Sequence, residues 1–322
     1  MRPRTTSSAA GVSIPVAALE QYAKGWVTEA EYRHLSPSTT QWRRHVTGKL
    51  LWLLHHEQFE TCGPDEIRQF IVYATKPQPG GRWGNSQQTS ENRPETVRTY
   101  YERLRAFFRW LVEEGFEDEN PMKTLKRPIV HHEQIQPFSE TDLKALLAAA
   151  KQSKHALQDA AILLFLLDTG VRASELCNLR IRDLDLTGMR AIVLGKGNKH
   201  RAVYIGLATA RAVRRYLKPL EQSPDSPVFI TERKQAFTPS SLRQMMERLG
   251  EAAGLKGVRC SPHTMRHTAA VMFLRAGGHV FALKEMLGHT TLDMTMKYVA
   301  LAQADVQAQH YQFSPVERLN LK

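Results

Sequence analysis

Apolar residues recur along the first third of the chain with the spacing of helices that bury one face. Between residues 14 and 125 they return every three or four positions, which is the period of an amphipathic helix. Residues 35–38 (LSPS) predict the start of one such helix, and two more are predicted over residues 63–74 and 94–114. The apolar stripe of the first of these helices consists of Trp42, Val46, Leu50 and Leu53. Residues 76–93 are polar and rich in glycine, so they predict a long loop. The first part of the chain therefore predicts an all-helical domain.

The helix predicted over residues 94–114 carries two stripes. Apolar side chains occupy the first stripe, and the second consists of Arg98, Glu102, Arg105 and Arg109. A polar stripe of this kind is most often a solvated face with an i,i+4 ion pair, although it also suits a surface that follows nucleic-acid phosphates. On this helix alone, the solvated face is the favoured interpretation.

The helical period is lost after residue 125. Pro128 and Pro137 interrupt residues 126–138, which predicts a linker between two domains. Helices return from Ser139, and the almost wholly apolar residues 157–167 predict a buried core helix. The chain is long enough for each domain to have a core of its own.

The second domain also contains short β-rich segments. Residues 191–194 and 201–205 predict a hairpin with Lys196 and Lys199 in its turn, and residues 228–230 could supply a third strand. Helices are predicted again from about residue 239 to residue 311. The chain as a whole therefore predicts a mainly α fold with a small antiparallel sheet.

The composition is that of a globular protein with an excess of positive charge. Of the 322 residues, 42% are apolar and 24% are charged, and the net charge is +12. This charge indicates a polyanionic partner, of which nucleic acid is the commonest, and most of the excess lies after residue 130. The plainer alternative is a basic protein that binds nothing acidic.

Other features argue against export, membrane insertion and a zinc ribbon. Cys62, Cys177 and Cys260 form no CxxC pair, which suits the reducing cytosol. No apolar run is long enough to cross a bilayer, and the N-terminus lacks the apolar region of a signal peptide. We therefore expect a cytoplasmic, nucleoid-associated protein with a disordered tail at residues 1–13 and no membrane partner.

The candidate chemistry is concentrated in residues 261–298. A predicted helix places His263 and Arg266 on one face, and His289 and Tyr298 follow. A tyrosine near a histidine and an arginine suggests a phenol nucleophile beside groups that bind a phosphate.

Plainer explanations exist for parts of this set. His263 and His267 have the spacing of zinc ligands, but no glutamate base lies between them and Cys260 has no cysteine partner. His267 is therefore expected to be a core or supporting histidine. Tyr204 and Tyr311 are alternative nucleophiles, although Tyr311 lies on an apolar helical stripe that packing explains better.

Two basic residues upstream are well placed to join this chemistry. Arg172 follows a glycine turn at the start of a helix predicted over residues 171–179, and Lys196 lies at the tip of the predicted hairpin. A fixed guanidinium suits a phosphate because it donates two parallel hydrogen bonds, whereas a mobile ammonium can protonate a leaving oxygen. Lys199 is the rival to Lys196 for that second role.

At these positions the chain resembles the tyrosine recombinase (phage integrase) family, and in particular its Xer-like members. Five pieces match in order and spacing: TGVRASEL (169–176), GKGNKHR (195–201), HTMRH (263–267), LGH (287–289) and Tyr298. The segments LSPSTTQWRR and RPETVRTYYERLRAFFRWLVEEG resemble the family's N-terminal core-binding domain. The resemblance covers nearly the whole chain.

The resemblance implies a role for each matched residue. It implies that the catalytic set is Arg172, Lys196, His263, Arg266, His289 and the nucleophile Tyr298. Glu175 matches an acidic position that supports the site. Contacts to DNA are expected from Arg43, Arg44, Arg98, Arg105, Arg109, Lys199 and Arg201.

The activity implied by the resemblance is site-specific DNA recombination, in integration and excision or in resolution. Strands would be cut and rejoined through a covalent 3′-phosphotyrosine, which retains the bond energy, so neither ATP nor a metal cofactor is expected. The expected partner is a double-stranded recombination site. The protein would be a monomer when free and a homotetramer in the synaptic complex, with an accessory protein or a partner recombinase as a further candidate.

The implied architecture has two domains that close around DNA as a C-shaped clamp. A helical, SAM-like core-binding domain would span residues 14–125, and an α/β tyrosine-recombinase catalytic domain residues 139–298. Residues 299–322 would form a tail that packs on a neighbouring protomer. Two alternatives stay open: a type IB topoisomerase, against which the core-binding domain and the tail argue, and a DNA-binding protein that uses this fold without cutting.

Overall fold

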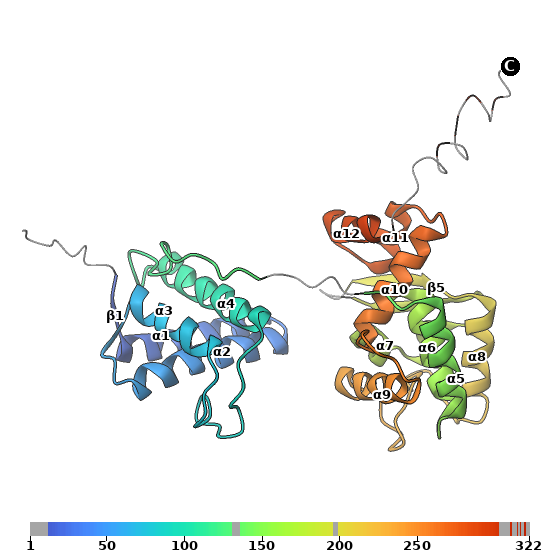
Figure 1. The fold of residues 1–322 in the computed structure, drawn as a ribbon, viewed down its shortest axis with the longest axis horizontal. Helices are drawn as coiled ribbons and strands as arrows, with labels where there is room; N and C mark the ends of the chain where they lie inside the picture. Colours follow the sequence, from blue (N-terminus) through green and yellow to red (C-terminus); the bar gives the residue numbers. More distant parts are fainter. Residues whose placement is uncertain are drawn as a thin grey trace, which may run out of the picture. The chain divides into compact units, whose positions relative to one another are not determined.

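The computed structural model describes residues 12–130, 136–195 and 199–302, together with residues 310, 314, 316 and 319. The chain divides into two compact units, unit 1 (Met1–Glu133) and unit 2 (Gln134–Lys322) (Figure 1). The boundary between them falls within residues 126–138, the segment interrupted by prolines. Each unit has its own hydrophobic core. No helix in the described part of the chain is long and apolar enough to cross a membrane.

Unit 1 is built from helices and one very short sheet. Its elements are β1 (Ile14–Pro15), α1 (Val16–Tyr32), α2 (Pro37–His56), β2 (Thr61–Cys62), α3 (Pro64–Thr75) and α4 (Pro94–Glu113), and β1 and β2 are antiparallel. α2 begins where predicted: Ser36 caps it, and its Oγ accepts a hydrogen bond from the Thr39 amide at 3.2 Å. The helical character predicted for this part of the chain is therefore confirmed.

The long helix α4 supplies much of the core of unit 1. Its predicted apolar stripe, including Tyr101, Leu104 and Phe108, is buried. The stripe predicted on α2 is buried at Val46, Leu50 and Leu53. Trp42, at the start of that stripe, is 37% exposed, and its ring packs edge-on against His45.

The segment predicted as a long loop, residues 76–93, folds back onto unit 1. Arg82 and Asn85 form an isolated antiparallel bridge, and the Arg82 side chain is buried. Trp83 packs against Trp52, with ring centroids 5.8 Å apart, and also against Phe70 and Tyr73. Because the Trp83 ring packs among these aromatic side chains, the polar segment is part of the packed domain.

Unit 2 combines helices with a three-stranded sheet. Its helices are α5 (Glu140–Gln152), α6 (Ala156–Thr169), α7 (Ala173–Asn178), α8 (Leu207–Leu217), α9 (Pro239–Ala252), α10 (Pro262–Arg275), α11 (Val280–Leu287) and α12 (Asp293–Ala302), with the short 3-10 helix η1 (Ile181–Asp183). The sheet is antiparallel in the order β3 (Leu184–Asp185), β4 (Arg190–Leu194) and β5 (His200–Tyr204). The predicted hairpin is thus confirmed as β4 and β5.

The prediction of a third strand at residues 228–230 was wrong. The third strand is β3, and Val228 instead makes one backbone hydrogen bond to Leu179, at 2.9 Å, outside the sheet. Val228 and Phe229 are buried in the core of unit 2, so their apolar character reflects packing rather than strand pairing. The helix predicted over residues 171–179 is likewise shorter, because α7 begins at Ala173.

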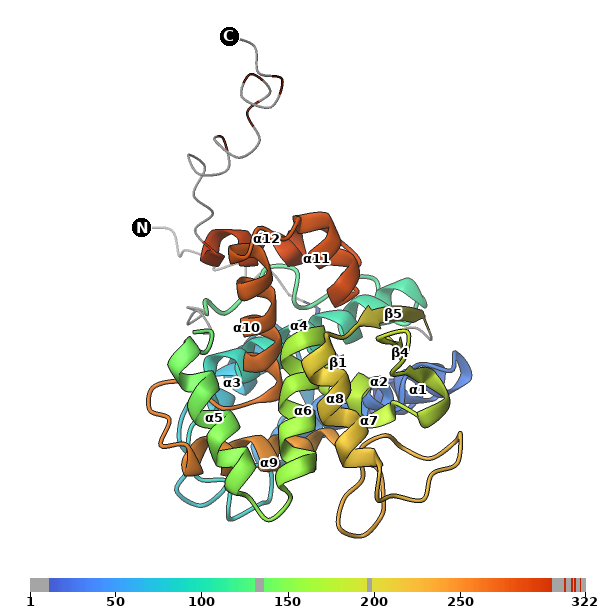
Figure 2. The same ribbon diagram turned by 90° about the vertical axis from the view of Figure 1, so that its right-hand side faces the viewer.

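The core of unit 2 is centred on α6, the almost wholly apolar helix. Ile162, Phe165 and Leu166 are fully buried in it, as predicted. Figures 1 and 2 both show α11 and α12 at one end of α10, and α9 at the opposite end of the unit. A small separate apolar cluster, which includes Val271, Leu287 and Tyr298, joins α10, α11 and α12. This three-helix corner carries most of the candidate chemistry.

Candidate active site

Helix ends position the candidate site. Ser261 caps α10, since its Oγ accepts a hydrogen bond from the Thr264 amide at 3.1 Å, and this starts the helix just before His263. Gly170, with φ of 59°, ends α6 in the left-handed conformation, which lets the chain turn to Arg172 at the N-cap of α7. Gly288, with φ of 63°, ends α11 in the same way and presents His289. Local signals therefore fix the helix ends at the three segments that carry Arg172, His263 and His289.

Arg266 is buried and fixed from three sides. Its Nη1 donates to the Gly170 carbonyl at 2.7 Å, and its Nη2 donates to the Leu287 carbonyl at 2.8 Å. The same Nη2 lies 3.1 Å from His289 Nε2. Burial lowers the pKa of Arg266 to about 10, and the charge of Arg172 acts in the same direction. The side chain therefore keeps its positive charge at neutral pH.

Arg172, at the N-cap of α7, also binds the end of α11. Its Nη2 donates to the Gly288 carbonyl at 3.2 Å, and its Nη1 donates to Glu175 Oε1 at 2.9 Å. The Arg172 side chain is about one-third exposed, so its guanidinium is held by the protein and still faces solvent. Arg172 and Arg266 thus present two oriented positive charges, which suits a phosphodiester.

Glu175 is a buried carboxylate, with a side chain only 1% exposed. Burial raises its pKa, but hydrogen bonds from Arg201 and from the Arg172 amide outweigh that effect, so the pKa lies below its ordinary value. Arg201 donates to it from both terminal guanidinium nitrogens, Nη1 and Nη2, at 2.6 and 2.8 Å. Arg201 was predicted to contact DNA; its guanidinium binds Glu175 and the Met286 carbonyl.

His289 is a buried, neutral histidine whose tautomer follows from its partners. Arg266 can only donate, so His289 Nε2 accepts, and the proton lies on Nδ1. That Nδ1 lies 2.8 Å from the Thr295 hydroxyl, to which it donates. Burial lowers the pKa of His289 to about 4, and the charges of Arg266 and Arg172 contribute. In this tautomer Nε2, which faces Arg266, can accept a hydrogen bond but cannot donate one.

Tyr298 is buried against two histidine rings. It is 1% exposed, stacks on His289 with a 10° angle between the ring planes, and meets His267 edge-on with centroids 5.0 Å apart. Burial raises the pKa of its phenol, whereas the charge and hydrogen bonding of Arg266 lower it, and burial dominates. The hydroxyl is therefore protonated at neutral pH.

His263 and His267 contact each other directly, with their Nε2 atoms 3.1 Å apart. His263 is exposed, yet partial burial of its ring lowers its pKa. The positive charges of Lys297 and Arg266 lower this pKa further. Burial lowers the pKa of His267 to about 4, with His263 as the next contributor. Across the described ranges, no group of three or more His, Cys, Asp and Glu side chains could hold a metal ion.

The lysine expected at the site, Lys196, lies outside the described residues. Its rival Lys199 is exposed directly before β5. A third lysine, Lys297, was missed by sequence reasoning, and its Nζ lies 5.1 Å from the centroid of the Tyr298 ring. Its position directly before the candidate nucleophile was the signal that could have identified it. Burial lowers its pKa, and Arg266 adds to the effect.

The alternative nucleophiles are placed differently. Tyr204 ends β5 and is exposed, and it makes none of the ring contacts that surround Tyr298. Tyr311 lies outside the described residues.

The arginines of unit 1 expected to contact DNA have different surroundings. Arg43 is mostly buried, because its Nη1 donates to Glu29 and to the Trp26 carbonyl. Arg44 is exposed and pairs with Glu31 at 3.1 Å. Arg98 lies on α4.

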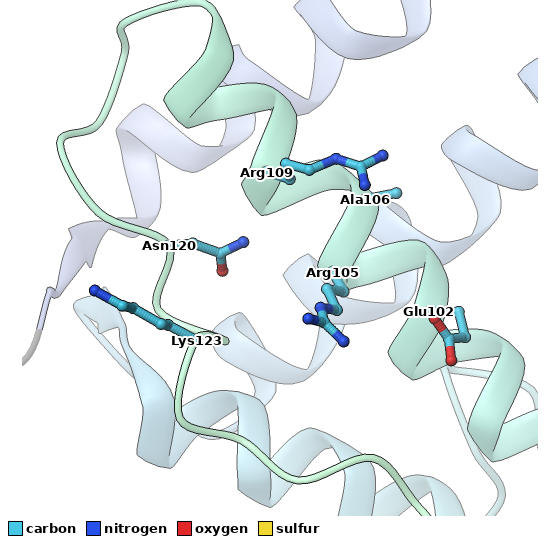
Figure 3. A pocket seen from close by; sticks show the side chains of 6 residues that line it. All are labelled: Glu102, Arg105, Ala106, Arg109, Asn120 and Lys123. Carbon is cyan, nitrogen blue, oxygen red and sulfur yellow. The ribbon is translucent and has the colours of Figure 1, made fainter.

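Arg105 and Arg109 line a groove of about 450 Å³ on α4. Figure 3 shows them on that helix, beside the returning segment that carries Asn120 and Lys123. Glu102 also lines the groove, where it pairs with Arg127. The groove thus gathers exposed positive charge on one side of unit 1.

Comparison with known proteins identifies the chain's relatives. The sequence profile described as the phage integrase family matches residues 136–305, more than half of the chain. The tyrosine recombinase XerC of Alcanivorax borkumensis is 29% identical over 278 residues, covering 84% of this chain and 86% of that relative. The XerC of Corynebacterium glutamicum is 30% identical over 219 residues, covering 67% of this chain and 68% of that relative.

Solved structures share the fold. The Tn1549 transposon integrase in complex with transposon right end DNA aligns with a TM-score of 0.69 and 19% identity, covering 94% of this chain and 100% of that one. The XerH site-specific recombinase bound to a palindromic difH substrate aligns with a TM-score of 0.66 and 19% identity, covering 94% of this chain and 85% of that one.

Proposed function

This chain belongs to the phage integrase family and is a tyrosine-type site-specific DNA recombinase, and we propose that Tyr298 is the nucleophile that cuts the strand. The observation that carries this assignment is the convergence of Arg172 and Arg266 on residues 287–289, with Tyr298 stacked on His289. A buried tyrosine beside two fixed guanidiniums is an arrangement for covalent attack on a phosphodiester.

The arginines bind the phosphate in this proposal. Attack concentrates negative charge on the non-bridging oxygens, and two oriented guanidiniums stabilise that charge without reorganising. Each already points donors at the end of α11, so the phosphate would bind beside Gly288 and His289. For His289 to donate to the phosphate from Nε2, it must exchange tautomer or gain a proton, since that nitrogen now accepts from Arg266.

Proton transfers accompany the attack. The Tyr298 oxygen bonds to phosphorus, the bond from phosphorus to the 5′ oxygen breaks, and a 3′-phosphotyrosine results. Because the phenol is protonated, a base must accept its proton. We assign that role to His263, which is neutral and whose Nε2 lies 3.1 Å from Nε2 of His267, the ring that meets Tyr298 edge-on. Lys196 on the hairpin turn would protonate the departing 5′ oxygen, with Lys199 as its rival.

Access to Tyr298 requires movement. The residue is 1% exposed, and α12 packs against α10 and α11. A DNA phosphate can reach the hydroxyl only if α12 shifts, so cleavage is expected to be coupled to a rearrangement of this helix.

The partner in this proposal is a double-stranded recombination site. The relatives named above include recombinases bound to DNA, and the basic groove on α4 supplies phosphate contacts in unit 1. Residues 299–302 belong to α12, and most of the later residues lie outside the described ranges. We also propose that four copies assemble on paired sites and that the tail after residue 302 packs on a neighbouring protomer. Removing the residues after 302 should abolish recombination between two sites and leave binding to one site intact; unchanged recombination would refute the role of the tail.

A covalent-adduct assay tests the nucleophile. The protein is incubated with a nicked suicide duplex of its site, and an adduct resistant to SDS is expected with the wild type and absent with Tyr298→Phe. Binding of the same duplex by Tyr298→Phe, measured by gel shift, serves as the folding control. An adduct that persists in Tyr298→Phe would exclude Tyr298, and no adduct with the wild type would indicate a protein that binds DNA without cutting.

A further inference from the structure

We propose that Arg201 is a positioning residue for cleavage, which neutralises buried Glu175 so that the charge of Arg172 remains available to the DNA phosphate. This inference rests on the proposed function and assigns Arg201 a role other than the DNA contact expected from its place in the hairpin. It concerns a residue on β5 that would never touch the reacting atoms.

The guanidinium of Arg201 is committed to the protein. Nη1 and Nη2 bind the two oxygens of Glu175 at 2.6 and 2.8 Å, and Nε donates to the Met286 carbonyl at 3.1 Å. Its side chain is 14% exposed, whereas Arg172, which shares the same carboxylate, is 33% exposed. A planar group held by three bonds is poorly placed to follow a DNA backbone.

Charge balance explains why two arginines share one carboxylate. Glu175 Oε1 accepts from Arg201 at 2.6 Å and from Arg172 at 2.9 Å, so Arg201 makes the shorter and bidentate contact. A buried carboxylate without a counter-ion is strongly disfavoured. Arg172 and Arg201 are the two charged side chains that bond Glu175 within the described ranges. Without Arg201, Arg172 would have to neutralise Glu175 alone and would be less available to the phosphate.

Arg201 also fixes the end of α11. Three consecutive carbonyls there, of Met286, Leu287 and Gly288, accept hydrogen bonds from Arg201, Arg266 and Arg172 respectively. Terminal helix carbonyls lack intrahelical partners and carry partial negative charge, so guanidiniums suit them. A Cβ at position 288 would lie 3.0 Å from Arg201 Cδ, closer than an ordinary contact, so the glycine that ends α11 leaves room for this side chain and also permits the positive φ.

The same side chain lies beneath the base of the hairpin turn. Gly195 donates to the Lys199 carbonyl at 2.8 Å, and a Cβ at Gly195 would lie 3.7 Å from Arg201 Nη1 and 3.6 Å from Glu175 Oε1. The ion pair therefore supports the hairpin stem, α7 and the end of α11 at once.

Charge-matched variants test the proposal on the full-length protein. Arg201→Gln should form the covalent adduct about 100-fold more slowly than the wild type at saturating DNA. Its dissociation constant for DNA and the salt dependence of that constant should change far less than the rate, because Arg201 itself neutralises no DNA phosphate and Arg172 is one of many phosphate contacts. Adding Glu175→Gln removes the opposing charge, so the double variant should recover to within about tenfold of the wild-type rate.

Arg190→Gln is the matched control. Arg190 lies on β4 and pairs with Asp185 at 3.4 Å in an exposed ion pair, so this variant should change neither DNA binding nor the adduct rate. Thermal melting by circular dichroism accompanies every variant. If Arg201→Gln melts below the assay temperature, the proposal is tested with the double variant alone, because both members of the buried pair are neutral in it.

The outcomes separate the hypotheses. Weaker DNA binding with a shallower salt dependence, at a normal saturating rate, would make Arg201 a DNA contact and overturn the proposal. A folded double variant that remains about 100-fold slow would also overturn it, because charge balance would then not be the reason. Absence of any adduct with the wild type would instead count against the proposed function, independently of Arg201.

Discussion

The arginines of unit 2 and those of α4 in unit 1 carry the same charge in opposite settings. Arg266 is 5% exposed and donates to two backbone carbonyls at 2.7 and 2.8 Å. Arg109 on α4 has a side chain 69% exposed, and it pairs with Glu113 on the surface at 3.4 Å. One group is held in a single orientation by the fold, and the other is free to adjust.

This difference shows how one residue type can serve two purposes. A buried guanidinium with satisfied hydrogen bonds is oriented before substrate arrives, and that orientation is what stabilises a reacting phosphate. A solvated guanidinium contributes mainly by displacing counter-ions from DNA, which needs charge and little geometry. Exchanging arginine for lysine should therefore distinguish the two regions.

The largest effect is expected for Arg266→Lys. Lysine keeps the charge but cannot reach the Gly170 and Leu287 carbonyls together as the planar fork does. We expect the rate of adduct formation at saturating DNA to fall by about 10²–10³-fold. The unpaired carbonyls should also cost about 1–3 kcal/mol of stability, which thermal melting measures. A near-normal rate would mean that Arg266 acts only as a charge, like the arginines of α4.

Acid should destabilise unit 2 before unit 1. The pKa values of His267 and His289 are lowered from 6.5 to about 4 in the folded protein. Between these pH values, both histidines are therefore protonated in the unfolded chain but neutral in the folded one. Stability therefore falls as the pH drops from about 6.5 towards 4, by roughly 1.4 kcal/mol per pH unit for each histidine. In unit 1, burial and the charge of Lys49 lower the pKa of His45 too, so a smaller effect is expected there.

The tryptophans make this prediction measurable in the intact protein. All five lie in unit 1: Trp26, Trp42, Trp52, Trp83 and Trp110. As the pH is lowered at constant urea, circular dichroism should report loss of helix before tryptophan fluorescence changes. A variant with His267→Asn and His289→Asn should narrow the gap, and simultaneous transitions in the wild type would contradict the prediction.

A moderate effect is expected when charge is removed from the α4 groove. The double change Arg105→Ala with Arg109→Ala should weaken DNA binding and reduce the slope of log affinity against log salt by about 0.9 for each DNA phosphate that is no longer neutralised. The adduct rate at saturating protein should stay the same, because these residues lie on unit 1 and not among the site residues. An unchanged slope would show that the groove binds no phosphate.

The smallest effect is expected when the same two positions keep their charge. Arg105→Lys with Arg109→Lys should alter DNA affinity by no more than about twofold, since exposed cations are worth little beyond their charge. The same salt titration measures it. A tenfold loss would reveal bidentate recognition in the groove and erase the contrast with Arg266.

The fold was predictable where local interactions decide it. α2 and α10 begin where the sequence indicates, and the apolar stripe of α4 is buried. Capping and helical periodicity depend on residues three or four positions apart, so they can be recognised in a sequence. Arg172, His263, Arg266, His289 and Tyr298 could also be grouped from motif spacing, and the structure brings these five side chains together.

The sequence by itself therefore determined the helices, the hairpin and the family. Only the tertiary structure decided which charges are buried and which residues neutralise them. Arg201 shows the difference, since it reads as an exposed hairpin cation but binds Glu175 across 26 positions and Met286 across 85. Such pairs form between segments that are remote in the chain, and no local propensity encodes them. Burial then makes each pair obligatory, because a lone charge inside the protein is far more costly than one in water.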